Sequence, residues 1–134
     1  MAATMVLYNT VGYSDYERAV RFYDAVFAVL GQPRCDGWEK GFAGWGASYD
    51  DGPSFWICPP FNGKPPAPGN GTMVGFRAKD ERQVQAFHAA ALANGGSDEG
   101  APGTRPYYEQ SFYVGYVRDP DGNKLSCFYH RHRP

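Results

Sequence analysis

Residues 14–23 read Ser-Asp-Tyr-Glu-Arg-Ala-Val-Arg-Phe-Tyr, and the spacing of two landmarks in this segment occurs twice in the chain. Asp15 precedes Phe22 by seven positions, and 65 positions later Asp80 precedes Phe87 by the same interval. Repetition at a fixed long interval indicates two copies of one supersecondary unit, and the junction of such copies favours a binding site. The fold is therefore expected to contain two similar halves.

The first half predicts a strand, a helix and three further strands. Residues 5–11 are rich in β-branched and aromatic side chains, which is typical of a strand. Ser14 with Glu17 has the pattern of a capping box, and the apolar stripe that follows at helical spacing ends at Gly31. Residues 34–60 are short apolar runs separated by glycines, which predicts three antiparallel strands.

The second half repeats this order after a linker. Residues 62–71 are nearly all turn formers, so they are expected to connect the two halves. Asp80, with a glutamine three positions later, predicts a second helix start, and residues 97–110 are expected to be irregular. Asp121-Gly122 repeats Asp51-Gly52 with a shift of 70 and predicts a tight turn. The expected strands of this half are 72–78, 111–117 and 124–129.

These elements predict an α+β fold of two βαβββ modules related by pseudo-two-fold symmetry. A chain of 134 residues is long enough for one core and short for two, so a single domain is expected. Its first module covers about residues 1–61, its linker about 62–71 and its second module about 72–134.

Composition excludes several classes of protein. A formal charge of −1 gives no electrostatic footprint for nucleic acid or for an anionic membrane. No apolar run is long enough to span a bilayer, and no signal peptide is evident at the start. Three cysteines without CxxC spacing fit neither a disulfide framework nor a structural zinc site, which favours a reducing cytoplasm.

Four segments, in order and with plausible spacing, give the chain a resemblance to the vicinal oxygen chelate superfamily. This superfamily includes glyoxalase I, extradiol dioxygenases and bleomycin-resistance proteins. The resemblance implies curved sheets that together form a cup, an open barrel, and it implies a homodimer. The segments are 14–19 with Phe22-Tyr23, 86–92 with Gly95-Gly96, 100–103 with Arg105-Pro106, and 119–123.

The same resemblance implies where a metal would bind. Metal-using members take ligands from the first and last strand of each module, typically His and Glu. The repeat register carries these positions to Tyr8, Trp56, Met73 and Ser126. Indole, thioether, hydroxyl and phenol groups do not hold a divalent first-row metal at neutral pH. No metal or other cofactor is therefore expected.

Two alternatives remain open for this set. If the register is wrong by one, Leu7 or Asn9 and Leu125 or Cys127 would take these places, and they do not rebuild a metal site either. A Glu109 and His130 pair is conceivable for acid–base work, although nothing in the sequence brings the two together. No catalytic constellation is identified, so enzymatic activity stays open.

The inward-facing positions predict a binding site for a small aromatic or drug-like molecule. Strand alternation puts Tyr8 with Thr10 on one face, and Met73 with Arg77 on the matching face. Trp56 and Tyr8 offer stacking area, and Ser126 offers a hydrogen bond. The tyrosine-rich segment 105–113 is expected to form a lid or a dimer contact, with Arg105 as an anion clamp. The complete expected set is Tyr8, Thr10, Trp56, Met73, Arg77, Arg105, Tyr113 and Ser126.

Two other functions compete with this one. The same residues would also suit a cup that is simply filled as core. A lyase, isomerase or dioxygenase acting through a metal at an atypical site is the enzymatic alternative.

Overall fold

The structure is a computed structural model that describes residues 5–35, 39–46 and 52–134. The chain forms two sheets, with strand orders β1-β3-β2 and β4-β7-β6-β5, and the two sheets do not close into a barrel within the described residues. This architecture confirms the α+β fold with two modules. The elements are β1 (Asn9–Gly12), α1 (Tyr16–Val29), β2 (Ala43–Trp45), β3 (Phe55–Cys58), β4 (Val74–Arg77), α2 (Glu81–Ala93), β5 (Ser97–Gly103), β6 (Tyr113–Arg118) and β7 (Lys124–Tyr129).

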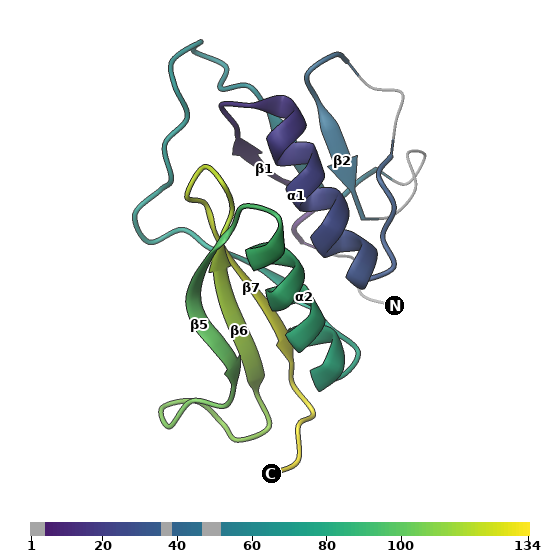
Figure 1. Ribbon diagram of the computed structural model, residues 1–134, viewed down its shortest axis with the longest axis vertical. Helices are drawn as coiled ribbons and strands as arrows, with labels where there is room; N and C mark the ends of the chain where they lie inside the picture. The colour runs from purple at the N-terminus through teal and green to yellow at the C-terminus, as the bar shows by residue number, and fades with distance from the viewer. Residues whose placement is uncertain (1–4, 36–38, 47–51) are drawn as a thin grey trace.

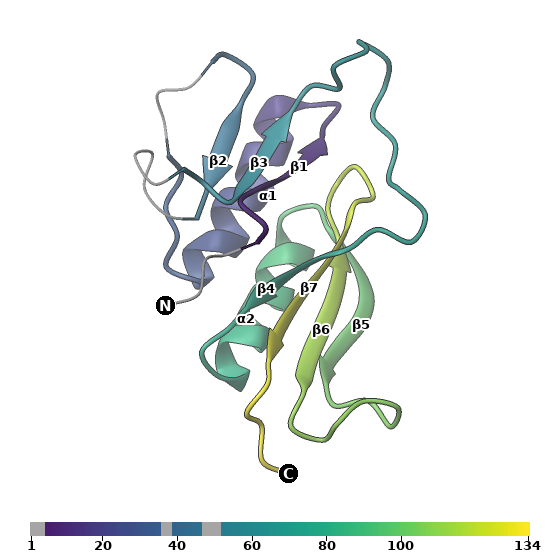
Figure 2. The same cartoon turned by 180° about the vertical axis from the view of Figure 1, so that it is seen from behind.

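The two modules share one arrangement. In each, the first strand pairs in parallel with the last, β1 with β3 and β4 with β7. The two helices lie side by side in front of the sheets (Figure 1), and the view from behind shows the opposite faces of both sheets (Figure 2). Neither helix has the length and apolarity needed to cross a bilayer.

Asp15, and not Ser14, is the N-cap of α1, which corrects the expected capping box. The Asp15 side chain accepts a hydrogen bond from the Arg18 backbone N–H at 3.0 Å. Ser14 instead donates to Asp121 in the other module, as described below. Gly31 follows the helix with a φ of 71°, a left-handed conformation that glycine adopts without cost.

The start of α2 agrees with the sequence prediction. Asp80 accepts a hydrogen bond from the Gln83 backbone N–H at 2.9 Å. The Gln83 side chain accepts from the Lys79 backbone N–H and donates to the Val29 carbonyl, both at 2.9 Å. One side chain therefore completes the cap of α2 and ties α2 to the end of α1.

Strands of the first module are shorter than expected. Of residues 5–11, only 9–11 belong to β1, which begins at Asn9 and ends at Gly12. Of the three strands expected between residues 34 and 60, β2 and β3 form, and Cys35 makes only an isolated bridge with Gly44. Residues 36–38 and 47–51, including the expected Asp51-Gly52 turn start, lie outside the described residues.

The second module has a strand where irregular structure was expected. Residues 97–103 form β5, which pairs antiparallel with β6. The pairing shifts register between Asp98 and Gly100 and again before Gly103, so side chains do not alternate regularly along the strand. The prediction of an irregular segment was wrong because these irregularities remove the period-2 pattern on which strand recognition depends.

One continuous core joins the modules. The Phe76 ring of β4 lies 5.0 Å from Phe27 of α1, 5.4 Å from Phe55 of β3 and 5.9 Å from Phe87 of α2, measured between centroids. Residues of both modules belong to the same buried cluster. Because the modules bury apolar surface against each other, their sheets are held in one relative orientation.

Candidate functional site

The first sheet turns one face to α1 and the other away from the helices, and we call the latter the cup face. Thr10 of β1 lies opposite Trp56 of β3, and Gly12 lies opposite Cys58. Residues that are opposite each other point to the same side of a sheet, so these four share the cup face. The neighbouring Ile57 is fully buried on the helix side.

The second sheet has a cup face defined in the same way. Gly75 and Tyr116 lie on either side of Ser126, and Arg77 lies opposite Phe128. These residues occupy the side of the sheet away from α2, the side turned to the reader in Figure 2. The alternation expected for Met73, Gly75 and Arg77 is therefore the one that the strand pairing gives.

An open groove of about 740 Å³ runs along the cup face of the first module. Tyr8 and Thr10 line it from the β1 side, Phe42 and Cys58 line it from the sheet, and Phe61 lines it from the segment after β3. The remaining lining residues are Gly12, Pro59, Pro60, Asn62, Pro65, Pro66 and Ala67. The groove is thus built largely from apolar and proline side chains, with a hydroxyl and a thiol among them.

Trp56 does not line this groove, but it shares the cup face with Thr10, which does, and its ring has a fixed orientation. Its indole N–H donates to the Pro53 carbonyl at 3.1 Å. Its ring covers Gly44, where a Cβ would come within 2.9 Å of the indole atom Cε3. The side chain is half-buried, and its residue lies opposite Thr10. A half-buried aromatic ring in a fixed orientation is a suitable stacking surface.

Three other expected residues lie in the second module. Met73 lines a separate depression with Arg118 and Lys124, and Arg77 lines a third hollow, near Phe55. Ser126 is only 3% exposed. The structure therefore brings Tyr8, Thr10 and Trp56 together and leaves the second-module positions as a separate group.

Arg105 and Tyr113 have local partners. The Arg105 guanidinium donates to the Ala101 carbonyl at 2.7 Å and to the Thr104 carbonyl at 3.1 Å. Tyr113 shares the helix side of β6 with Gly115, and its hydroxyl accepts a hydrogen bond from Gln85 of α2 at 2.8 Å. Tyr113 is therefore not brought to the cup face.

The side chains at the four expected metal positions do not fit a divalent metal ion. Across the strands, Thr10 and not Tyr8 lies opposite Trp56, and Gly75 and not Met73 lies opposite Ser126. Neither alignment supplies an imidazole, thiolate or carboxylate group. Over the part of the chain that the structure describes, no three His, Cys, Asp or Glu side chains converge as ligands would.

The neighbouring positions considered for a shifted register do not fit a metal either. Leu125 and Cys127 are buried on the helix side of β7. Burial raises the pKa of the Cys127 thiol to about 12, so it carries no thiolate at neutral pH. Asn9 is exposed and alternates with Thr10, which places it off the cup face.

His88 links two elements of the second module, whereas Glu109 and His130 make no hydrogen bond or ion pair with each other among the described residues. His88 Nε2 lies 2.9 Å from the Asp98 carboxylate and links α2 to β5, as a structural histidine does. This contact lowers the pKa of Asp98, together with the hydrogen bond from the Gly100 N–H. Glu109 and His130 are both exposed.

Tyr116 and Lys124 are cup-face residues that the sequence reasoning missed. Lys124 lies opposite Arg118, and Tyr116 lies opposite Ser126. Their pairing was predictable from the sequence, because the turn at residues 119–123 joins two antiparallel strands and so fixes which residues lie opposite each other. Counting outward from that turn would have put Tyr116 next to Ser126.

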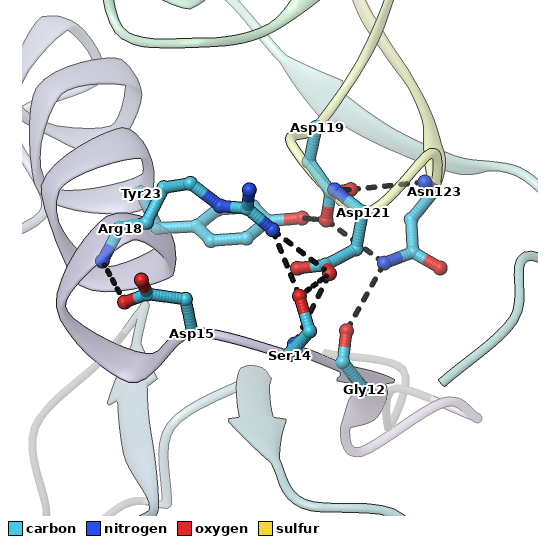
Figure 3. Close-up of polar contacts among 8 residues, drawn as sticks. All are labelled: Gly12, Ser14, Asp15, Arg18, Tyr23, Asp119, Asp121 and Asn123. Atoms are coloured by element: carbon cyan, nitrogen blue, oxygen red, sulfur yellow. Dashed lines mark hydrogen bonds and ion pairs between the residues drawn. The ribbon is translucent and has the colours of Figure 1, made fainter. Parts of the chain in front are cut away.

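A polar cluster at the module junction fixes the angle between the sheets (Figure 3). The Tyr23 hydroxyl of α1 donates to Asp119 Oδ2 at 2.5 Å, and both groups are buried. Asn123 donates to the same oxygen at 2.9 Å and to the Gly12 carbonyl of β1 at 3.3 Å. The turn after β6 is therefore bonded to both α1 and β1 of the first module.

The second part of this cluster is ionic. Asp121 Oδ1 accepts from the Ser14 hydroxyl at 2.7 Å and from its backbone N–H at 3.1 Å. The Arg18 guanidinium lies 3.2 Å from the same oxygen, as Figure 3 shows. Asp119 and Asp121 are each engaged by donors from the other module, so these two carboxylates hold the modules together.

The family model of the Glyoxalase/Bleomycin resistance protein/Dioxygenase superfamily matches residues 6–126, and the chain belongs to this superfamily. A glyoxalase/bleomycin resistance protein from Albidiferax ferrireducens T118 is 38% identical, with a TM-score of 0.80 over 98% of this chain and 100% of that one. The resemblance inferred from the sequence is thereby confirmed.

More distant solved structures share the fold. A glyoxalase/bleomycin resistance protein/dioxygenase family enzyme from Burkholderia phytofirmans PsJN has 18% identity and a TM-score of 0.70, over 93% of this chain and 98% of that one. The lactoylglutathione lyase from Agrobacterium tumefaciens has 18% identity and a TM-score of 0.60, over 95% and 94%. No match to the chain was found among curated proteins.

Proposed function

We propose that this protein binds a small, flat aromatic molecule on its cup face without the help of a metal ion. The observation that carries the proposal is the half-buried Trp56 ring, held over Gly44 on the same cup face as the groove that Tyr8 and Thr10 line. A concave apolar surface with few polar groups is the usual environment for such ligands. Sequestration of a drug-like compound is one use of this binding.

The donor chemistry of the cup supports binding without a metal. Tyr8, Trp56, Met73 and Ser126 supply neutral oxygen, thioether and indole groups, which are poor ligands for the metals that polarise oxygen substrates. A metal-dependent lyase, isomerase or dioxygenase of the same superfamily would need ligands from outside these positions. That alternative is a possible outcome of the experiment below.

We also propose that the protein is a homodimer. Several large apolar side chains on or near the cup face are exposed, which a second copy would cover. They are Leu7 (67% exposed), Tyr8 (57%), Phe61 (fully exposed) and Met73 (48%). Light scattering during size-exclusion chromatography measures the mass in solution.

Metal content and ligand-induced stabilisation test the proposed function together. Protein grown with added nickel, zinc, iron and manganese is expected to contain well under one metal ion per chain by mass spectrometry. An aromatic compound library is expected to contain ligands that raise the melting temperature. At a hundredfold excess over Kd, such a ligand adds about 2.7 kcal/mol to the free energy of unfolding. Trp56→Ala is expected to abolish this rise.

Leu92→Ala is the matched control, because Leu92 is 42% exposed on α2, away from the cup face. It is expected to leave the ligand-induced rise unchanged. One tightly held metal ion per chain would sink the metal-free proposal and favour the enzymatic alternative. Equal stabilisation of the wild type and Trp56→Ala would mean that the ligands bind elsewhere.

A further inference from the structure

We propose that the cup face of the second module selects anionic aromatic ligands, that is, flat rings bearing a carboxylate, sulfonate or phosphate group. This inference rests on the proposed function, because both place an aromatic ligand on the cup face, and it names the charge class that the second module takes, apart from the groove of the first module. It is carried by an aromatic surface next to cations that have no carboxylate partner.

The aromatic surface consists of rings in mutual contact. The Phe112 ring stacks on Phe128 at 5.2 Å between centroids and meets Tyr108 edge-on at 5.4 Å. Tyr107 meets Tyr108 at 4.7 Å, and the Tyr108 hydroxyl accepts a hydrogen bond from Tyr116 at 3.4 Å. These five residues, Tyr107, Tyr108, Phe112, Tyr116 and Phe128, extend from the middle of β6 and β7 to the loop before β6. We call them the aromatic surface.

Two cations lie against the centre of this surface. The Nζ of Lys124 and the Cζ of Arg105 are each 5.4 Å from the centroid of the Tyr116 ring. Arg77 lies further along the cup face, opposite Phe128. None of these three side chains makes an ion pair with a described Asp or Glu residue. The charge of Arg105 interacts with the Asp98 carboxylate at longer range and helps to lower the pKa of Asp98, so the positive charge next to the rings is only partly compensated.

The neighbouring Arg118 shows the contrast. Its Nε lies 2.5 Å from the Glu99 carboxylate, so its charge is compensated within the sheet. The Arg118 guanidinium also donates to the Gly122 carbonyl at 2.7 Å, so it stabilises the turn between β6 and β7. Of the cup-face cations of this module, Arg118 is structural, whereas Lys124 and Arg105 are available to a ligand.

Arg105 is held in place before any ligand arrives. Its hydrogen bonds to Ala101 and Thr104 use two of the five guanidinium N–H groups. Gly100 makes room for it, because a Cβ there would come within 3.0 Å of both Arg105 Nη2 and Tyr116 Cδ2. A pre-oriented guanidinium loses less entropy when it binds a carboxylate, and such charge-assisted hydrogen bonds are about twice as strong as neutral ones.

Tyr116 does not oppose this charge preference. Burial, with a smaller effect of the Tyr108 hydroxyl, raises the pKa of Tyr116 to about 12, so the phenol stays neutral at physiological pH. A neutral ring between two cations does not repel the acidic group of a ligand. A neutral aromatic ligand would use the rings but would leave both cations without a partner.

A matched pair of probes tests the proposal on the full-length protein. 2-Naphthoate and 2-naphthamide have the same ring system and differ in charge, and isothermal titration calorimetry measures both affinities. Naphthoate is expected to bind at least about tenfold more tightly, since hydrogen bonds to charged groups exceed neutral ones by roughly the 1.4 kcal/mol that a factor of ten requires. This preference is expected to weaken with added salt.

Substitutions assign the preference to this surface. The double variant Arg105→Gln with Lys124→Gln is expected to lose the preference for naphthoate, while its affinity for naphthamide stays within about twofold. Arg82→Gln, an exposed cation on α2, is the matched control and is expected to keep the preference. Circular dichroism spectra verify that each variant is folded.

The possible results separate this inference from the proposed function. Equal binding of the two probes would overturn the charge preference and leave aromatic binding intact. Binding of neither probe at millimolar concentration would overturn this inference, whereas the compound library and Trp56→Ala would still test the proposed function at the first module. A preference that survives in the double variant would overturn its assignment to Arg105 and Lys124. A double variant that changes only the monomer–dimer equilibrium would assign the surface to a second copy of the chain, which also overturns the proposal.

Discussion

Gly96, between α2 and β5, occupies a place that no side chain can share. A Cβ there would lie 2.7 Å from the Arg118 carbonyl oxygen, 2.7 Å from Phe22 Cε2 and 2.8 Å from the Ala91 carbonyl oxygen. Two of these atoms belong to the backbone and cannot move aside independently. We expect Gly96→Ala to reduce the free energy of unfolding by about 1–3 kcal/mol, as overpacking of a core does.

Urea denaturation measures this loss, with Gly103→Ala as the matched control in β5. The nearest atom to a Cβ at Gly103 is Arg105 Nη1 at 3.6 Å, an ordinary contact, so that variant is expected to change stability by less than about 0.5 kcal/mol. Equal effects of the two variants would contradict the steric argument.

Glycine also shows what the sequence reveals at the scale of single residues. The Asn94-Gly95-Gly96 run is typical of a helix end, and α2 ends directly before it, at Ala93. It does not distinguish Gly95, whose φ of 95° favours glycine, from Gly96, which is needed for space against Phe22. The second reason depends on a residue far away in the sequence, so no local pattern contains it.

At the scale of elements, substitutions at the two helix N-termini test which side chain caps each helix. Asp15→Ala is expected to destabilise the protein by about 1 kcal/mol, because the backbone N–H of Arg18 loses its acceptor at the start of α1. Asp80→Ala is expected to cost a similar amount at α2, where the same bond is made to Gln83.

Ser14→Ala gives the comparison for this pair of variants, because it removes the hydroxyl bond to Asp121, keeps the backbone N–H bond to Asp121 and leaves the helix cap in place. Amide hydrogen exchange in the first turn of α1 separates the two roles. Exchange there should accelerate in Asp15→Ala and stay near the wild-type rate in Ser14→Ala. The reverse pattern would restore Ser14 as the cap.

The capping error has a physical origin. Both Ser14 and Asp15 are good N-cap residues, and either could accept a backbone N–H two or three positions later. Asp121 decides between them, since it engages the Ser14 hydroxyl from the other module. Long-range contacts of this kind also put Tyr113 on the helix side of β6, because its hydroxyl pairs with Gln85. The helices and the alternation of strand residues were predictable from local sequence, whereas the long-range hydrogen-bond partners of Ser14 and Tyr113 were not.

At the scale of the whole molecule, the duplicated pattern gave the two modules and the cup-face alternation of Tyr8, Thr10 and Trp56. It did not reveal the aromatic surface of the second module, because that surface depends on the pairing of β6 with β7 and on a loop that folds back over them. Strand alternation in the sequence predicts which face of a sheet a residue lies on. Which residues lie opposite each other depends on strand pairing, which the alternation does not contain.

The module junction also makes the stability of the whole protein depend on pH in the alkaline range. Burial, and then the nearby Asp119 carboxylate, raise the pKa of Tyr23 well above its ordinary value of 10.0. Burial raises the pKa of Cys127 from 9.0 to about 12. In the unfolded chain these groups lose their protons near their ordinary values, while the folded protein keeps them. The native state therefore binds more protons above about pH 9, and stability must fall as pH rises through that range.

The free energy of unfolding is expected to be nearly constant from pH 7 to 8.5 and to decline above pH 9, by up to about 1.4 kcal/mol per pH unit for each such group. Tyr23→Phe should be less stable at pH 7 by about 1–3 kcal/mol, since Asp119 loses a buried donor. Its decline above pH 10 should be shallower than that of the wild type, because one of the raised groups is gone. Tyr107→Phe, at a residue that is 72% exposed, should follow the wild-type curve. Urea denaturation at each pH measures all three curves, and parallel wild-type and Tyr23→Phe curves between pH 10 and 11 would remove Tyr23 from this explanation.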